Sequence, residues 1–324
     1  MITATNFNHI NSIVAYLRRV PYDIAPKRLY DGRTLYQGYV AGDDTSFDTC
    51  FDSRVYNHFI ATGKMTKIVE ESLARAIHDH AMHTALNDFF KEHDSHRCVG
   101  VMGGHALKRD DEAYRTIALL SKQLTERGFV MISGGGPGAM EATHLGAWMA
   151  GRSMAEADDA LSILAQAPTF HSCEWMHTAF QVMEKYEQSR YVSLGIPTWL
   201  YGHEPSTPLA THIAKFFDNS IREDSILTLA YGGIIYAPGS AGTMQEIFQE
   251  AVQNHYLSFG FSSPMIFLGT KFWSTEMPVY PLLKSLMETG KYKNLRLTIT
   301  DDCAQVIKEL EAFVKELPPN SNKD

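Results

Sequence analysis

The stretch FVMISGGGPGAMEATHLGAWMAGR, residues 129–152, predicts a strand, a turn and a helix in direct succession. A short apolar run opens the stretch and is typical of a buried strand. The residues GGGPG at 134–138 then interrupt it, and apolar residues return at helical spacing. A strand that passes through a glycine turn into a helix is the repeating unit of α/β folds.

The same unit recurs on both sides of this stretch. Upstream, CVGVMGG at 98–104 is a short apolar run ending in glycine, and an amphipathic helix follows at 111–128, with Gly128 placed to end it. Strands separated by helices predict a Rossmann-like, doubly wound parallel sheet with helices on both faces. The further predicted strands lie at 191–200, 232–239, 264–269 and 295–300, and a last helix lies at 301–317.

We divide the chain into an N-terminal extension, 1–95, a nucleotide-binding domain, 96–318, and a disordered tail, 319–324. A helical insertion is expected within the domain at about 152–190. The extension is expected to be irregular with short helices, apart from one clear helix at 67–93. That helix has a predicted apolar face and a solvated face that carries His78, His80 and His83. The predicted apolar face consists of Val69, Leu73, Ile77, Ala81, Leu86 and Phe90.

Composition narrows the class of protein. The chain has 324 residues and a formal net charge of −8, from 29 basic and 37 acidic residues, so a nucleic-acid partner is not expected. There is no signal peptide and no apolar run long enough for a membrane span, which indicates a cytoplasmic protein. Its four cysteines are widely spaced without a CxxC pair, so reduced and mostly buried thiols are expected.

Two glycine turns are the candidate binding elements. In SGGGPGAME, 133–141, glycines let the backbone approach a ligand, and Pro137 is expected at the first helical position. PGSAGTMQE, 238–246, repeats this pattern and adds the Thr243 hydroxyl. The N–H groups at the start of each following helix would face an anion. Glycine turns also serve purely steric needs, but two of them on neighbouring strands favour a phosphate-bearing ligand; neither turn fits a P-loop or the GxGxxG spacing.

Together the two turns resemble the paired signatures GGGxxGxM and PGGxGTxxE of the Lonely Guy (LOG) family, over roughly residues 97–315. The chain looks closer to the longer bacterial members of that family than to the short plant-type ones. The resemblance implies an enzyme that hydrolyses the N-glycosidic bond of a nucleoside 5′-monophosphate such as AMP. It also implies that no metal or organic cofactor is needed, and that the protein is a homodimer or larger homo-oligomer.

By this resemblance, Arg222 in the segment 217–227 and Glu246 take the catalytic roles. Ser240 departs from the family pattern, which has glycine at that position. Residues expected to contact substrate or phosphate are Gly134, Gly135, Gly136, Gly138, Met140, Gly239, Ser240, Gly242 and Thr243. Expected contacts to base or ribose are Gly103, Tyr201, His203 and Glu204.

Several alternatives stay open at this point. Glu246 is alternatively a first-turn acid that complements the helix dipole, and Arg222 alternatively forms a surface salt bridge with Glu223 or Asp224. Tyr201, His203 and Glu204 are alternatively a simple loop. For the whole protein, the alternative to an enzyme is a nucleotide-sensing module that binds a monophosphate without turning it over. Decarboxylation through pyridoxal phosphate has little support, because neither turn contains a lysine.

Overall fold

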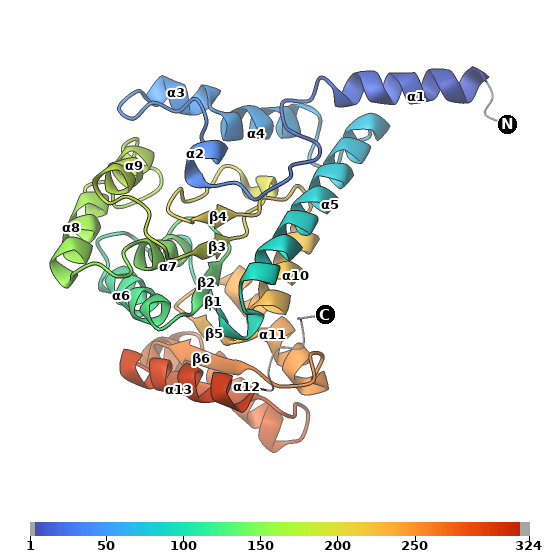
Figure 1. Cartoon of the computed structure of the whole chain (residues 1–324). Helices are drawn as coiled ribbons and strands as arrows, with labels where there is room; N and C mark the ends of the chain where they lie inside the picture. Colours follow the sequence, from blue (N-terminus) through green and yellow to red (C-terminus); the bar gives the residue numbers. More distant parts are fainter. Residues whose placement is uncertain (1–3, 318–324) are drawn as a thin grey trace.

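A seven-stranded sheet forms the centre of the molecule (Figure 1). The computed structural model describes residues 4–317. Every pair of neighbouring strands is parallel, in the order β4-β3-β2-β1-β5-β6-β7. The strands are β1 (Cys98–Met102), β2 (Val130–Ser133), β3 (Ser193–Gly195), β4 (His212–Ile213), β5 (Gly233–Tyr236), β6 (Pro264–Leu268) and β7 (Arg296–Thr300).

This topology confirms the predicted α/β class and corrects two details. The strand β4 was not predicted, because two residues are too few to produce a hydrophobic pattern. The two glycine turns were expected on neighbouring strands, but they follow β2 and β5, and β1 lies between these two. From β1 the chain moves through β2 and β3 to β4, and then returns to the other side of β1 as β5. The carboxyl ends of β1 and β5 therefore flank the point where ligands bind in open parallel sheets.

Both faces of the sheet are covered by helices, as predicted (Figure 1). Within a strand, Val99 and Val101 pack on one face, and Cys98 and Met102 pack on the other. The first face is covered by α6 (Glu112–Glu126), α7 (Ala139–Trp148) and α13 (Cys303–Glu316), with α8 (Met154–Ala165) and α9 (Trp175–Lys185) beside them. The second face is covered by α5 (Val69–Glu92), α10 (Asn219–Leu229), α11 (Ala241–Tyr256) and α12 (Val279–Glu288). The described residues also form short helical turns at η1 (Ser95–Arg97), η2 (Trp199–Tyr201) and the π-helical η3 (Phe272–Glu276).

The extension packs directly onto the sheet-bearing part of the chain. Its buried residues Tyr22, Leu35 and Phe59 belong to the same hydrophobic cluster as the first face of the sheet, and α5 covers the second face. The extension and the sheet-bearing part of the chain therefore share one hydrophobic core. The division into two domains at residue 95 stays a prediction. Before α5, the extension contains α1 (Ala4–Leu17), which runs outward in Figure 1, α2 (Gly32–Leu35), α3 (Asp44–Thr49) and α4 (Phe51–Ala61).

The helix α5 is present, but half of the residues predicted to form its apolar face are exposed. Val69, Leu73 and Ile77 are 57%, 39% and 39% exposed. The first half of the helix buries polar side chains instead, because they have partners outside the helix: Glu71 lies within hydrogen-bond distance of the Tyr22 hydroxyl and His58, and Asp79 accepts hydrogen bonds from the backbone before α10. The buried residues of α5 are Glu71, Ala74, Arg75, His78, Asp79, Met82, Ala85, Leu86 and Phe89.

His78 also differs from the prediction. It is fully buried, and its ring nitrogens lie 3.0 Å from Asp79 Oδ1 and 3.1 Å from the Tyr30 hydroxyl. His80 and His83 are exposed, as expected. Periodicity alone cannot separate the buried histidine from the solvated ones, because the difference depends on partners supplied by Tyr30 and by the residue next to His78.

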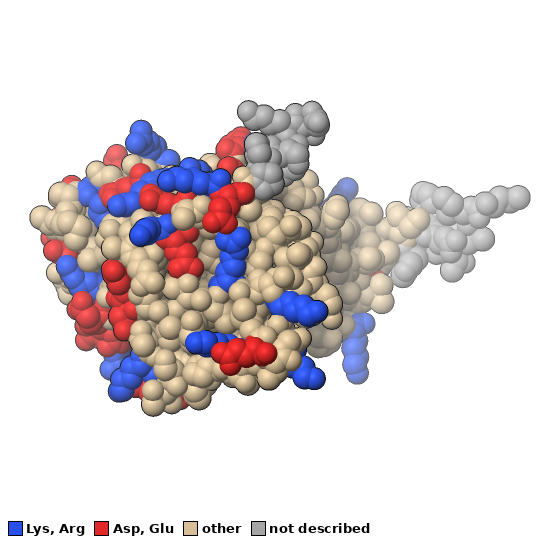
Figure 2. Space-filling view, turned by 90° about the horizontal axis from the view of Figure 1, so that it is seen from below, with Lys and Arg blue, Asp and Glu red and all other residues tan. Residues whose placement is uncertain are grey.

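Several other expectations can be compared with the structure. Gly128 follows the end of α6 with φ at +85°, as a terminating glycine should. All four cysteines are free, but only Cys50 and Cys98 are buried. Across residues 4–317, no helix is long and apolar enough to cross a membrane. Figure 2 shows acidic and basic side chains interspersed on the face seen from below. The predicted tail at 319–324 lies outside the described residues.

Candidate functional site

The turns that follow β1, β2 and β5 meet at the switch point of the sheet. The Gly104 N–H donates to the Pro238 carbonyl at 2.9 Å, and the Ala139 N–H donates to the Gly104 carbonyl at 3.2 Å. Gly103 lies between the other two turns, since a Cβ built on it would be 2.7 Å from Ala139 Cβ and 3.0 Å from Ala237 Cβ. The residues predicted from separate parts of the sequence are thus brought into one site.

The turn after β2 requires glycine at two positions for conformational reasons. Gly135 and Gly138 have φ values of +69° and +70°. A Cβ on Gly138 would also lie 2.4 Å from the Gly104 carbonyl oxygen. Gly138 is the N-cap of α7, so Pro137 precedes the helix and the prediction that it takes the first helical position is wrong. The reason is that φ at Gly138 is positive, which delays the helix by two residues.

The turn after β5 leads into α11 and leaves open space before it. Ser240 is the N-cap, exposed, with φ at −123° and no side-chain capping bond. Its conformation does not need glycine, so serine fits here without strain. A Cβ on Gly239 would lie 2.2 Å from Thr243 Oγ1, whereas a Cβ on Gly242 would meet nothing within 4 Å. Gly242 therefore has open space on its side-chain side, and the first N–H groups of α11 have no intrahelical acceptor, as helix N-termini that bind anions require.

Glu246 lies in the second turn of α11, beside this space. Burial raises its pKa to about 7; the Arg222 guanidinium acts in the opposite direction, and Glu223 acts in the same direction as burial. The first turn of α11 contains no acidic residue, so the alternative role of Glu246 as a first-turn dipole partner is wrong. A carboxyl group that titrates near pH 7 can take up or release a proton under physiological conditions.

Arg222 comes from the first turns of α10 and reaches across to the turn after β2. Its Nε donates to the Ile196 carbonyl at 3.0 Å. A Cβ on Gly134 would lie 2.4 Å from Arg222 Nη2, so the guanidinium rests directly on this glycine. The alternative of a surface salt bridge is not what the structure contains, since Glu223 accepts from Asn219 and Gln245, and Asp224 accepts from Gln249.

Met140 completes the wall of the three-glycine turn. A Cβ on Gly134 would lie 2.8 Å from its sulfur, and a Cβ on Gly136 would lie 2.7 Å from its Cε. Arg222 and Met140 therefore occupy the volume that side chains at 134 and 136 would need. A side chain at 134 or 136 would therefore require the end of Arg222 or Met140 to move.

The predicted base or ribose contacts are only partly brought to this site. Glu204 Oε1 lies 3.8 Å from both His105 Nδ1 and His203 Nε2, which connects the loop after β3 with the turn after β1. Tyr201 and His203 are largely exposed, at 44% for Tyr201. His105 was missed by sequence reasoning, although its position directly after Gly103 and Gly104 could have identified it.

Sequence reasoning also missed a buried ion pair near the turn after β2. Arg109 donates to Glu141 through Nε at 2.7 Å and Nη2 at 2.6 Å, and the Tyr114 hydroxyl donates to the same carboxylate at 2.9 Å. The Arg109 Nη1 group bonds Thr178 and the Trp175 carbonyl, which attaches the insertion to α7. Because Glu141 is fully buried and fully paired, we assign it to structure rather than to chemistry.

The part of the chain that the structure describes contains no group of three or more His, Cys, Asp or Glu side chains that could hold a metal ion. His171, Cys173 and His177, which the sequence places near one another, form no such group.

Comparisons with known proteins identify similar folds. No family model and no curated protein matches the chain. The molybdenum cofactor carrier protein from Chlamydomonas reinhardtii matches with 15% identity and a TM-score of 0.41, covering 67% of this chain and 98% of that one. A structural-genomics target named TM1055 matches with 17% identity and a TM-score of 0.41, over 68% and 99% of the two chains. A molybdenum cofactor binding protein from the phototrophic bacterium Rippkaea orientalis matches with 15% identity and a TM-score of 0.39, over 67% and 96%. At these identities and scores, the matches carry no conclusion about activity.

Proposed function

We propose that this protein hydrolyses the N-glycosidic bond of a nucleoside 5′-monophosphate such as AMP, releasing the free base and ribose 5-phosphate. One observation carries the proposal: the Arg222 guanidinium rests on Gly134 where three glycine-containing turns meet, and the Glu246 carboxyl is near enough to Arg222 to interact with it electrostatically. The paired motifs described above support the same reaction.

The phosphate is proposed to bind in front of α11. Gly242 leaves this space open, and the first N–H groups of the helix lack intrahelical partners. These groups and the helix dipole favour an anion at that position. With the phosphate held there, the ribose extends along the following turn of the helix, toward Glu246.

Glu246 is proposed to act on the water. In hydrolysis, a water oxygen forms a bond to C1′, the C1′–N bond breaks, and its electron pair leaves with the base. The Glu246 carboxylate accepts the proton that the water loses, and its negative charge stabilises the positive charge that develops on the ribose. The departing base takes up a proton from solvent and Glu246 releases its proton to solvent, so the sum is nucleotide plus water giving base plus ribose 5-phosphate.

Arg222 is proposed to grip the nucleotide through its planar guanidinium. Its Nε is engaged with Ile196, which holds the group in place on Gly134. A fixed fork of donors recognises phosphate or base acceptors better than a flexible ammonium does.

The test is a panel of nucleoside 5′-monophosphates assayed for release of ribose 5-phosphate, with adenosine as the matched compound that lacks phosphate. We expect at least one monophosphate to be turned over and adenosine to be a far poorer substrate, because charge-assisted bonds to the phosphate are roughly twice as strong as neutral ones. Binding of AMP without release of adenine would instead support the nucleotide-sensing alternative, and equal turnover of AMP and adenosine would contradict the phosphate site.

We also propose that the protein is at least a dimer, as the resemblance to the LOG family implies. Light scattering at micromolar concentration measures this directly, and a mass equal to one chain would contradict it.

A further inference from the structure

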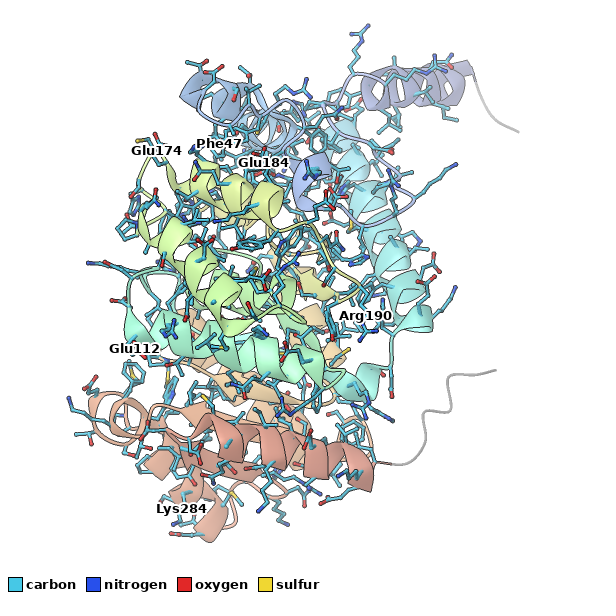
Figure 3. All side chains as sticks on the ribbon, turned by 60° about the vertical axis from the view of Figure 1, so that its left-hand side comes forward. Phe47, Glu112, Glu174, Glu184, Arg190 and Lys284 are labelled. Atoms are coloured by element: carbon cyan, nitrogen blue, oxygen red, sulfur yellow. The ribbon has the colours of Figure 1, made fainter. Side chains whose placement is uncertain are left out.

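A cavity of about 510 Å³ lies next to the site described above, between the extension and the carboxyl edge of the sheet; its lining includes His203 but none of the residues of the two glycine turns. Cavities of about 300–1,000 Å³ are typical of small-molecule sites. Three segments far apart in the sequence form its walls: α3 and α4 of the extension, the segment that precedes and begins α9, and the loop after β3. Figure 3 shows the first two walls next to each other, with Phe47 on α3 beside Glu174 at the start of α9.

Aromatic rings lie on opposite walls of this cavity. The extension contributes Phe47 and Tyr56, and the segment before α9 contributes Phe170; Trp175 also lines the cavity but is buried, with the Arg109 guanidinium over its ring. The Tyr56 ring is held against the loop after β3, since a Cβ on Gly202 would lie 2.4 Å from its Cδ2. Rings on facing walls suit a flat aromatic ligand, because they can stack on it from both sides.

The charge of the walls excludes a phosphate as the main ligand. The described residues that line the cavity include no Lys or Arg. The carboxylate of Asp52, which is buried, is neutralised by Lys215 Nζ at 2.7 Å and by the Trp199 indole N–H at 2.8 Å. Asp48 adds a further carboxylate at the exposed edge. Carboxylate and neutral polar groups accept hydrogen bonds from amino groups, as a nucleobase or aromatic amine presents them.

A second cavity lies between this one and the turn after β2. A smaller cavity of about 140 Å³ shares Phe170, His171 and Trp175 with it and reaches Pro137 and Gly138 of the turn after β2. A ligand in the larger cavity is thus separated from the phosphate space but lies on the same edge of the sheet.

We propose that this cavity is a binding site for an uncharged, amino-bearing heteroaromatic ring of the nucleobase class, and that the extension supplies half of it. The site is distinct from the Glu246 site and does not depend on hydrolysis there. In this proposal, the wall formed by α3 and α4 gives the extension a role in ligand binding, in addition to its role in the hydrophobic core.

The experiment is titration calorimetry of the full chain with adenine. We expect wild-type protein to bind adenine, Phe47→Ala to weaken binding at least tenfold through loss of one stacking ring, and Ser53→Trp to abolish binding by filling the cavity from α4. Ile60→Ala is the matched control, because Ile60 lies on the exposed side of α4 and does not line the cavity. Circular dichroism establishes that each variant is folded; if Ser53→Trp does not fold, Phe47→Ala still decides.

Two results would overturn the proposal. The first is absence of adenine binding, or equal affinity in wild type and Phe47→Ala. The second is displacement of adenine by inorganic phosphate, since that would place adenine at the glycine turns. This test measures adenine binding and does not use AMP hydrolysis, so its result is independent of the result for the proposed function.

Discussion

At the scale of single residues, the protonation of Glu246 determines when the proposed reaction runs. Its pKa is raised to about 7 by burial, and a general base must be ionised. We therefore expect kcat/KM for AMP to rise with pH and to level off above about pH 7, because this parameter reports the free enzyme's groups. A profile measured from pH 5 to 9 checks this, and a rate that is flat across that range would remove Glu246 as the base.

Glu246 and Arg222 could be proposed from the sequence because the segments that contain them resemble those of the LOG family. Whether they act stays a prediction; the structure places Arg222 against Gly134, and Glu246 near enough to Arg222 to interact with it electrostatically. His105 and Glu204 show why other residues were missed or left open. The position of His105 directly after Gly103 and Gly104 could have identified it, but its proximity to Glu204 depends on the loop after β3 approaching the turn after β1, and no local pattern contains that information.

At the scale of elements, the turn after β2 holds the site by its backbone. Gly138→Ala would place a Cβ 2.4 Å from the Gly104 carbonyl and keep φ at +70°. We expect a loss of unfolding free energy of roughly 1–3 kcal/mol or more, as residues forced into such conformations show. Gly242→Ala is the control for stability, because space is open there. Denaturant unfolding measures both, and equal stability of the two variants would contradict this reading of the turn.

The helix α11 also contains Glu250, a buried carboxyl group whose ionisation makes the stability of the folded protein depend on pH. This carboxyl accepts a hydrogen bond from Ser263, yet burial raises its pKa to about 7, from 4.5. A raised pKa in the folded state means that its contribution to stability is complete below pH 4.5 and is lost as pH rises toward 7. The unfolding free energy of the wild-type protein should therefore fall between pH 5 and 8 as Glu250 ionises. In Glu250→Gln this fall should be smaller by on the order of 2–3 kcal/mol. Thermal unfolding at both pH values checks this, and an unchanged slope would contradict it.

The strands and most helices could be predicted because each buries a continuous or periodic apolar set. The helix α5 shows the limit: its first half buries Glu71, Arg75 and Asp79, and exposes Val69, Leu73 and Ile77. A periodic pattern identifies the helix, but the buried face is decided by polar partners on α4 and in the backbone before α10. The short β4 was missed for a different reason, since two residues show no period.

At the scale of the whole molecule, the extension is part of the core. Tyr22, Leu35 and Phe59 pack in the cluster on the first face of the sheet, and α5 covers the second face. We expect a chain that begins at residue 96 to lose cooperative unfolding, because removing residues 1–95 exposes both apolar faces to water. Near-ultraviolet circular dichroism and thermal unfolding check this. A truncated chain that unfolds cooperatively at the wild-type temperature would show that the domain is independent.

The most direct test of the central claim compares Glu246→Gln with Glu250→Gln in the AMP assay. The same chemical change is made one helical turn apart, at the half-buried Glu246 and the buried Glu250, whose pKa values are both raised to about 7. We predict that Glu246→Gln still binds AMP but loses about a thousandfold or more in kcat, since general-base help alone is worth on the order of 10²–10⁴, whereas Glu250→Gln keeps its activity. Turnover of AMP by Glu246→Gln at a rate near wild type would contradict the account.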